Sequence, residues 1–456
     1  MSWTPPEGAP TSFVGTPATA PGPDGPTMLR GLQVIRRNPL RALAATWRAY
    51  GDVVQYPIPR PPTYLVNDPA GVRRVLVDNA RNYGKSTIQY RALSLVTGEG
   101  LLVADTEQWR RQRPLVQPAF HHRTLETLVG HVVGVTDDVR AQWRALPSGA
   151  VVDVDTAMMR AALEVVGHAL FGTDLSDDAE RLGHATLAAL EVVVARARVP
   201  LTPPAWMPTP GNLRLRHAVG ELDAAVRSML TQPVRGHDML DLLREVRDES
   251  GAGLSVQEIR DQIVTFIVAG HETVASALTW AWALLARDQD VQDALAQEAR
   301  AVLGDRAPVL ADLERLPYAR AVVDETLRLY PPAWLITRKA READNVGGHD
   351  IPAGAIVIVS PWLLHRHPDR WDEPAAFRPE RFLSGDVDRT AFIPFGAGPR
   401  LCIGRDFSYV EAVLMLAGLA RDVRLTYPAG TQVPRADALV TLRPVGGLPL
   451  RVSPRS

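Results

Sequence analysis

The chain has 456 residues, of which 46% are hydrophobic and 22% are charged, and its formal net charge is −1. These proportions are typical of a soluble globular protein, and the small net charge excludes a general electrostatic attraction to nucleic acid or to an anionic membrane. A single cysteine excludes internal disulfides and multi-cysteine metal sites, and it fits a reducing cytoplasm.

The N-terminal region, residues 1–27, is rich in Pro, Gly and Thr. It lacks the basic start and apolar core of a signal peptide, so we expect an extended or partly disordered arm. No run of about 18 apolar residues follows, and we therefore expect no transmembrane anchor. Residues 28–456 show neither repeats nor a linker, and their helical periodicity predicts one mostly α-helical domain with a small β portion.

The first elements after the arm combine helix and strand patterns. Residues 29–50 have a helical pattern that ends at Gly51, and residues 53–67 alternate as a strand whose prolines favour an edge position. Residues 72–79 return to a helical pattern. Residues 81–100 are rich in Gly, Ser and Tyr and are predicted to form a loop.

A helix that begins near Thr106 carries Trp109 and Arg113, which are four residues apart and therefore share a face. Considered alone, the pair is as consistent with a basic surface patch beside a half-buried tryptophan as with a functional site. Residues 170–213 are largely apolar and are interrupted by prolines, so we expect helices joined by a loop.

A long helix is predicted from Ser255 to about Arg287, on the order of 48 Å at 1.5 Å per residue. Ser255 and Glu258 have the spacing of a capping box, which is a strong helix-start signal. A helix of this length must cross the molecule, so its middle is expected to be buried.

The middle of this helix reads Ala269-Gly270-His271-Glu272-Thr273. Gly270 costs about 1 kcal/mol relative to alanine in a helix interior, and Thr273 can donate a hydrogen bond to the Ala269 carbonyl. The simplest interpretation is a close-packing glycine, a satisfied hydroxyl and a surface carboxylate. We expect no ligand role for His271.

Residues 318–329 form another predicted helix, which is stopped by Pro331-Pro332. Glu325 and Arg328 lie on one face of it and, considered alone, would be an ordinary surface ion pair. A short strand is predicted at residues 355–360.

The only cysteine lies in the pattern Phe395-x-x-Gly398-x-Arg400-x-Cys402-x-Gly404. An apolar helical pattern follows, and the N-terminus of a helix favours a thiolate. The glycines let a flat partner approach the backbone, and Arg400 suits a carboxylate. A lone cysteine is otherwise most often a small buried hydrophobe.

This pattern resembles the haem-binding loop of the cytochrome P-450 family, in which a cysteine thiolate binds the haem iron. The resemblance extends from about residue 29 to residue 451 and implies a triangular, mostly helical body around a buried haem b. Three further motifs resemble the family in the expected order: Trp109-x-x-x-Arg113, Ala269-Gly270-x-Glu272-Thr273, and Glu325-x-x-Arg328 with Arg381.

The resemblance implies roles for these residues. Cys402 would bind the iron, Thr273 would form a hydrogen bond with bound dioxygen, and Glu272 would help to relay protons. The remaining haem contacts would be Trp109, Arg113 and Arg338 at the propionates, together with Arg400, Phe395, Gly404 and Gly270. Glu325, Arg328 and Arg381 would fix the cysteine loop. The substrate pocket would comprise Phe266, Ile267, Ala269, Trp334, Leu335, Ile336 and Leu439.

The implied activity is that of a haem-thiolate monooxygenase that inserts one atom of dioxygen into a lipophilic substrate. The apolar pocket favours a lipophilic ligand. The segments at residues 441–449 and 330–334 resemble bacterial members of the family that oxidise fatty acids or carotenoids, which implies hydroxylation of a long-chain fatty acid or a similar lipid such as a carotenoid, with terpenoid or polyketide tailoring as the alternative. A peroxide-driven peroxygenase and a non-catalytic haem sensor are alternative functions, which the intact Glu272-Thr273 pair disfavours.

We recognise no flavin or iron–sulfur module in this sequence, so we expect electrons to reach the haem from an external donor. We expect a ferredoxin with its reductase, in the cytoplasm. Arg110, Arg111 and Arg405 are predicted to provide a local positive patch for an acidic redox protein.

Overall fold

The computed structural model describes residues 4, 18–58, 61–171, 176–197, 203–231, 239–248, 251–385 and 387–455, and the chain divides into two compact units. Unit 1 comprises Met1–Arg91, Ala333–Ala376 and Val387–Cys402. Unit 2 comprises Ala92–Pro332, Phe377–Asp386 and Ile403–Ser456. Much of the predicted N-terminal arm, and parts of the 170–213 segment, lie outside the described residues.

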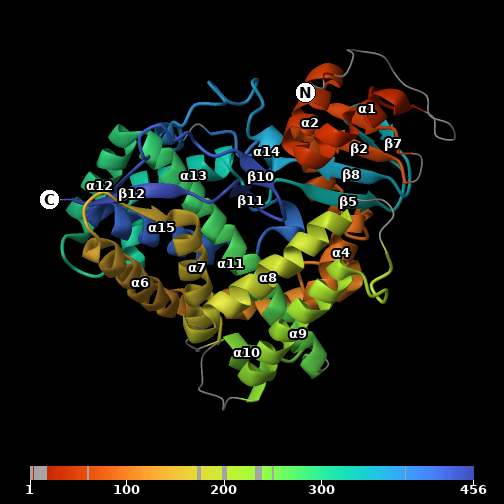
Figure 1. The fold of residues 1–456 in the computed structure, drawn as a ribbon. Helices are drawn as coiled ribbons and strands as arrows, with labels where there is room; N and C mark the ends of the chain where they lie inside the picture. Colours follow the sequence, from red (N-terminus) through yellow and green to blue (C-terminus); the bar gives the residue numbers. More distant parts are fainter. Residues whose placement is uncertain are drawn as a thin grey trace. The chain divides into compact units, whose positions relative to one another are not determined.

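Unit 1 is built on a five-stranded sheet with the strand order β1-β2-β8-β5-β3. Only the β2–β8 pair is parallel, and Figure 1 shows β2, β8 and β5 side by side. The strands are β1 (Val53–Tyr56), β2 (Thr63–Val66), β3 (Tyr83–Gly84), β5 (Ile336–Ala340) and β8 (Ile356–Val359), and a separate hairpin joins β6 (Asp344–Val346) to β7 (His349–Ile351). The helices of unit 1 are α1 (Gly25–Arg37), α2 (Pro39–Tyr50), α3 (Pro69–Arg73) and α14 (Pro361–Leu364), and α4 (Ile88–Thr97) continues into unit 2.

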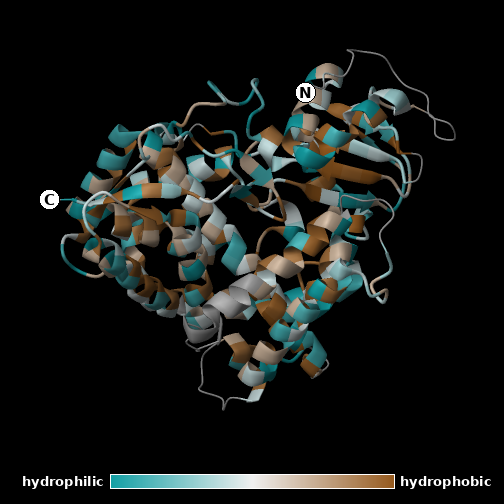
Figure 2. Ribbon diagram, in the orientation of Figure 1, coloured by the Kyte–Doolittle hydropathy of each residue, from teal (hydrophilic) through white to brown (hydrophobic). Residues whose placement is uncertain are grey.

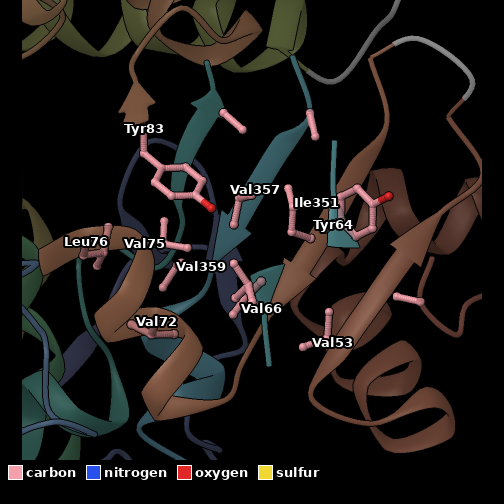
Figure 3. Close-up of a cluster of buried hydrophobic side chains, with 14 of the residues drawn as sticks. Val53, Tyr64, Val66, Val72, Val75, Leu76, Tyr83, Ile351, Val357 and Val359 are labelled. Atoms are coloured by element: carbon pink, nitrogen blue, oxygen red, sulfur yellow. The ribbon is translucent and has the colours of Figure 1, made fainter. Parts of the chain in front are cut away.

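A hydrophobic core holds this sheet against the turn at residues 74–78 (Figure 3). Tyr64, Val66, Val357 and Val359 contribute from the central strands, and all four are fully buried. Figure 2 shows the strands at the centre of the sheet as hydrophobic. Because Ile393 and Ala397 belong to or pack against the same core, the cysteine loop rests on this sheet.

Unit 2 is mostly helical. Its long central helix α11 packs against α7, α13 and α15, and α15 also packs against α6 and α12. The helices are α5 (Thr106–Val116), α6 (His122–Ala145), α7 (Val154–Phe171), α8 (Ser176–Ala197), α9 (Pro210–Thr231), α10 (Met239–Glu245), α11 (Val256–Arg287), α12 (Gln289–Leu303), α13 (Pro317–Leu329) and α15 (Arg405–Asp422). The strands form the sheet β4-β12-β9 and the hairpin β10-β11: β4 (Ala150–Asp153), β9 (Val423–Thr426), β10 (Ala436–Ala438), β11 (Leu442–Pro444) and β12 (Pro449–Pro454).

The prediction for the long helix is confirmed at both ends. Ser255 and Glu258 form the reciprocal capping box, and α11 ends at Arg287. Its length and hydropathy would also suit a membrane span, but 83% of its most apolar stretch is buried inside the protein, as in the core helix of a globular unit. The mostly α-helical fold class with a small β portion is confirmed as well.

Two early predictions were wrong in detail. The helix predicted at 29–50 is two helices, because Asn38 precedes a proline and cannot continue the first. Asn38 instead ends α1 and caps α2, with its side chain accepting from the Arg41 amide at 3.1 Å. Residues 72–79 are likewise divided, between the end of α3 and a wide helical turn at Arg74–Asp78.

The segments predicted as a loop and an edge strand also differ from the structure. Residues 81–100 contain α4, whose Ala92, Leu93 and Val96 are buried at helical spacing, a pattern obscured by the Gly, Ser and Tyr residues around it. Residues 53–67 form two antiparallel strands, of which β1 is at the edge and β2 is internal. All residues of both strands are buried, so burial does not alternate along them.

Candidate functional site

The cysteine loop has a backbone shape that only its glycines allow. Gly396 and Gly398 have φ values of 73° and 69°, a left-handed conformation that residues with a Cβ adopt at a cost. The Cys402 amide donates to the Phe395 carbonyl at 3.1 Å, which closes the loop. The Cys402 side chain is exposed on unit 1, and α15 begins three residues later at Arg405.

Two contacts fix this loop to the rest of unit 1. A Cβ at Gly398 would lie 2.0 Å from the Leu76 carbonyl oxygen, so no larger residue fits there. The Ile393 amide donates to Nε2 of the buried His365 at 2.9 Å. The position of Cys402 is therefore set by close backbone packing as well as by its own hydrogen bonds.

Arg338 provides a test of whether the site fits a haem. The side chain is buried on β5, where it donates to the Tyr90 hydroxyl at 3.1 Å and to the Thr337 carbonyl at 2.9 Å. No carboxylate of the described residues pairs with this guanidinium. A buried cation without an anion is costly, and a haem propionate would supply the missing charge. An exposed thiol and an unpaired buried arginine in one unit therefore fit a haem.

The other predicted haem contacts are placed as follows. Trp109 and Arg113 are half-buried on α5 of unit 2, four residues apart. Arg400 is half-buried in unit 1 at the end of the short turn Gly398–Arg400. Gly404 precedes α15 in unit 2, and a Cβ there would lie 3.7 Å from Phe120.

The middle of α11 has the hydrogen bond that the sequence predicted. The Thr273 hydroxyl donates to the Ala269 carbonyl oxygen at 2.6 Å, which leaves its oxygen lone pairs available as acceptors. Ala269, Gly270 and Thr273 are half-buried. A Cβ at Gly270 would lie 3.1 Å from Val166 of α7, so this glycine also permits close helix packing.

Glu272 is not a surface charge, because its side chain is 2% exposed. Burial raises the pKa of Glu272 to about 7, against the opposing effects of the Arg443 charge and of a hydrogen bond from the Thr441 hydroxyl. That hydroxyl donates to Oε2 at 3.4 Å. A carboxyl with a pKa near neutrality can both take up and release a proton, as a proton relay requires.

His271 is also buried, and burial lowers its pKa to about 4. The imidazole is therefore neutral at pH 7. Its Nδ1 has no hydrogen-bond partner among the described residues, and the ring forms a hydrogen bond with the Met159 backbone.

Glu325, Arg328 and Arg381 come together in a buried cluster rather than a surface ion pair. Arg328 donates to both carboxylate oxygens of Glu325, at 2.6 and 2.8 Å, and Arg381 donates to Oε1 at 3.2 Å. The Arg378 amide adds a further bond to Oε1 at 2.9 Å. The cluster joins α13 to the segment Phe377–Asp386 within unit 2.

The predicted substrate-pocket residues fall into separate environments. On α11, Ile267 is fully buried and Phe266 packs edge-on against Phe120, with their rings 5.5 Å apart. Trp334 and Leu335 line an apolar cavity of about 170 Å³ in unit 1, together with α1, α2 and the sheet. Ile336 is half-buried, with its Cδ1 3.9 Å from where a Gly396 Cβ would lie, and Leu439 is half-buried in the β10–β11 hairpin.

The structure adds residues that the sequence analysis missed. Thr441 and Arg443 of the β10–β11 hairpin act on Glu272, and Asp155 at the start of α7 pairs with Arg443. Asp261 and Gln262 of α11 accept hydrogen bonds from the Glu99 and Leu101 amides, which fixes the end of the predicted 81–100 loop. The alternation of polar Thr441 and Arg443 around buried Leu442 is the signal that could have indicated the hairpin residues.

The comparison with protein families decides the assignment. The model of the family described as cytochrome P-450 matches residues 20–449. The chain belongs to the cytochrome P-450 family. Its cofactor is haem b, and the protein is a cytochrome P-450 monooxygenase.

Three bacterial relatives match almost the whole chain. Cyclooctatin synthase of Streptomyces melanosporofaciens is 36% identical over 91% of this chain and 92% of its own. Cyclooctat-9-en-7-ol 5-monooxygenase of the same organism is 34% identical over 93% and 92%. Pentalenene oxygenase of Streptomyces avermitilis is 33% identical over 96% and 97%.

Proposed function

We propose that this cytochrome P-450 hydroxylates a cyclic terpenoid hydrocarbon or alcohol. The observation that carries the proposal is the full-length similarity to three proteins, a synthase and two oxygenases, whose names specify cyclooctatin, cyclooctat-9-en-7-ol and pentalenene. The apolar side chains of the predicted pocket suit such a molecule, since it offers few polar atoms to bind. The fatty acid or carotenoid favoured by the sequence is the competing substrate class.

Each catalytic residue has a proposed role that follows from its surroundings. A thiolate-bound haem supplies dioxygen activation. Cys402 would provide the thiolate, and Arg338 of unit 1 would pair with a propionate; Trp109 and Arg113 of unit 2 are further proposed propionate ligands. Thr273, whose hydroxyl proton is donated to the Ala269 carbonyl, would offer its oxygen lone pairs as acceptors, and Glu272 would hold a proton that the reaction consumes.

Glu272 also distinguishes the monooxygenase from its two rivals. A peroxygenase takes its oxygen atom, together with the electrons and protons of the reaction, from peroxide, and a sensor needs no turnover. Neither therefore needs net delivery of protons from solvent, which is the role proposed for Glu272. We therefore expect product from dioxygen and an electron donor, and less product from peroxide at the same turnover time.

The electron donor is proposed to be a ferredoxin with its reductase, in the cytoplasm. The predicted positive patch is weaker than the sequence suggests, because each arginine has an acidic partner. Arg110 pairs with Glu107 at 2.8 Å, Arg111 with Glu258, and Arg405 with Asp406 at 2.8 Å. We expect the rate of first-electron transfer to fall modestly between 0.1 and 1 M salt, where the Debye length falls from about 10 Å to about 3 Å. A rate independent of salt would contradict docking on this patch.

A ligand screen tests the substrate class. Purified protein is titrated with pentalenene and other cyclic terpene hydrocarbons and alcohols, and with fatty acids of matched carbon number, while the shift of the haem absorption band is followed. We expect the cyclic terpenoids to shift the band at lower concentration and to give hydroxylated product with a ferredoxin system. Tighter binding and turnover of fatty acids would refute the terpenoid assignment.

A further inference from the structure

A buried polar face runs along α11 beyond the Glu272-Thr273 pair. Glu272, Ser276, Thr279 and Trp280 recur at helical spacing, so they share one side of the helix, and all four are buried. Ser276 Oγ and Trp280 Nε1 both donate to the Leu442 carbonyl, at 2.6 and 2.9 Å. These two bonds hold strand β11 against α11.

The residues on either side of Leu442 complete the network. Thr441 donates to Glu272 Oε2 at 3.4 Å. Arg443 Nη2 donates to Asp155 Oδ2 at 2.5 Å, and Asp155 Oδ1 accepts from the Thr279 hydroxyl at 3.3 Å. The network therefore starts at Glu272, passes along β11 to α7, and returns to α11 seven residues further on.

Two charges of opposite sign act on Glu272 through this network. Arg443 stabilises the ionised carboxylate, whereas Asp155 destabilises it. Many of the other charged groups on α11 and on the helices packed against it are paired: Glu258 with Arg111, Arg260 with Asp223 and Asp261, Arg160 with Glu164 of α7, and, on α13, Glu325 with Arg328 and Arg320 with Asp324. The imidazole of His271 is neutral at pH 7, and burial raises the pKa of Glu411 of α15 well above its ordinary value. His168 of α7 stacks on His131.

We propose that Thr441, Arg443 and Asp155 are positioning residues for Glu272. Thr441 fixes the orientation of the carboxyl, and the Arg443–Asp155 pair sets how readily the carboxyl takes up and releases a proton. The inference rests on the proposed relay role of Glu272 and extends it to residues on two other elements. None of the three needs to touch the substrate or the haem for this role.

The test is an infrared titration of the haem-loaded protein. The carbonyl-stretch band of the protonated Glu272 carboxyl is identified by its loss in Glu272→Gln, and its midpoint is followed with pH. Arg443→Gln removes a favourable charge and should raise the midpoint by about one pH unit or more, whereas Asp155→Asn should lower it. Thr441→Val should also raise the midpoint, and Thr441→Ser should restore it.

Opposite shifts distinguish an electrostatic role from a merely structural one. Ser276→Ala is the matched control, since it removes a bond to β11 without changing any charge, and its midpoint should stay at the wild-type value. The double variant with Arg443→Gln and Asp155→Asn removes both charges of this pair, so the titration midpoint of Glu272 should return toward the wild-type value. Equal shifts in both single variants, or a shift as large in Ser276→Ala, would overturn the proposal.

The pH dependence of the coupling between electron use and product formation distinguishes a failure of the relay role of Glu272 from a failure of the positioning role of its neighbours. If Glu272→Gln leaves coupling unchanged at every pH, the proposed relay role itself is wrong. If Glu272→Gln lowers coupling but the Arg443 and Asp155 variants leave both the midpoint and the coupling profile unmoved, only the positioning role is wrong.

Discussion

Replacing Glu325 by glutamine should destabilise unit 2 severely. The carboxylate and Arg328 are both fully buried, and Glu325 accepts two bonds from Arg328, one from Arg381 and one from the Arg378 amide. Glu325→Gln removes the carboxylate charge that pairs with the Arg328 guanidinium while preserving the size of the side chain. Removing one partner of a buried ion pair costs about 3–5 kcal/mol. Total stability is on the order of 5–15 kcal/mol, so at least about a fifth of it would be lost.

The assay is urea unfolding of the haem-loaded protein, followed by circular dichroism and by release of haem. Glu107→Gln is the matched control, because Glu107 also pairs with an arginine three residues away, Arg110, but its side chain is 83% exposed. An exposed pair of this kind is worth about 0–1 kcal/mol, so the control should unfold almost as the wild type does. If Glu325→Gln costs no more than Glu107→Gln, the buried cluster does not stabilise the fold and the reasoning fails.

Three further changes have expected outcomes. Thr273→Ala should preserve haem binding but divert electrons into hydrogen peroxide, so peroxide formed per electron consumed should rise. An unchanged ratio would show that Thr273 has only a structural role, through its hydrogen bond to Ala269. The pKa of Glu272 is about 7 in the folded protein and 4.5 ordinarily, so the wild type should lose stability as pH rises from 4.5 to 8. Glu272→Gln has no proton to lose, so its free energy of unfolding relative to wild type should rise by up to about 3 kcal/mol across that window. Parallel stability curves in urea titrations at each pH would contradict this. Gly398→Ala should lose haem as well as stability, because the added Cβ would meet the Leu76 carbonyl. The control Gly430→Ala, at φ 78° with nothing within 4 Å of the added Cβ, should retain haem. Equal haem content in the two variants would show that the close contact at Gly398 does not matter.

The sequence predicted the elements that are specified locally. The start of α11 follows from Ser255 and Glu258 three residues apart, and the end of α13 follows from the Pro331-Pro332 pair. Helix α4 was missed because the flanking glycines and polar residues suggest a loop, although Ala92, Leu93 and Val96 are buried.

The long-range contacts around Glu272 could not be predicted in the same way. Glu272 and Thr441 are 169 residues apart, and Arg443 and Asp155 are 288 residues apart, so no local pattern brings either pair together. Burial was expected for the middle of α11 as a whole, but the sequence does not show that the Glu272 side chain itself is buried, because a glutamate is most often exposed. The position of Trp334 on an apolar cavity with α1 and α2 depends on the same kind of distant packing.

The measurement that tests the central claim most directly is the absorption spectrum of the reduced carbon-monoxide complex, recorded for wild type, Cys402→Ala and Cys402→His. The account predicts a band at the thiolate-specific position in the wild type. It also predicts loss of that band in both variants, with a spectrum of histidine-ligated haem in Cys402→His. Retention of the wild-type band in either variant would contradict Cys402 as the iron ligand, and with it the haem-thiolate monooxygenase built around this loop.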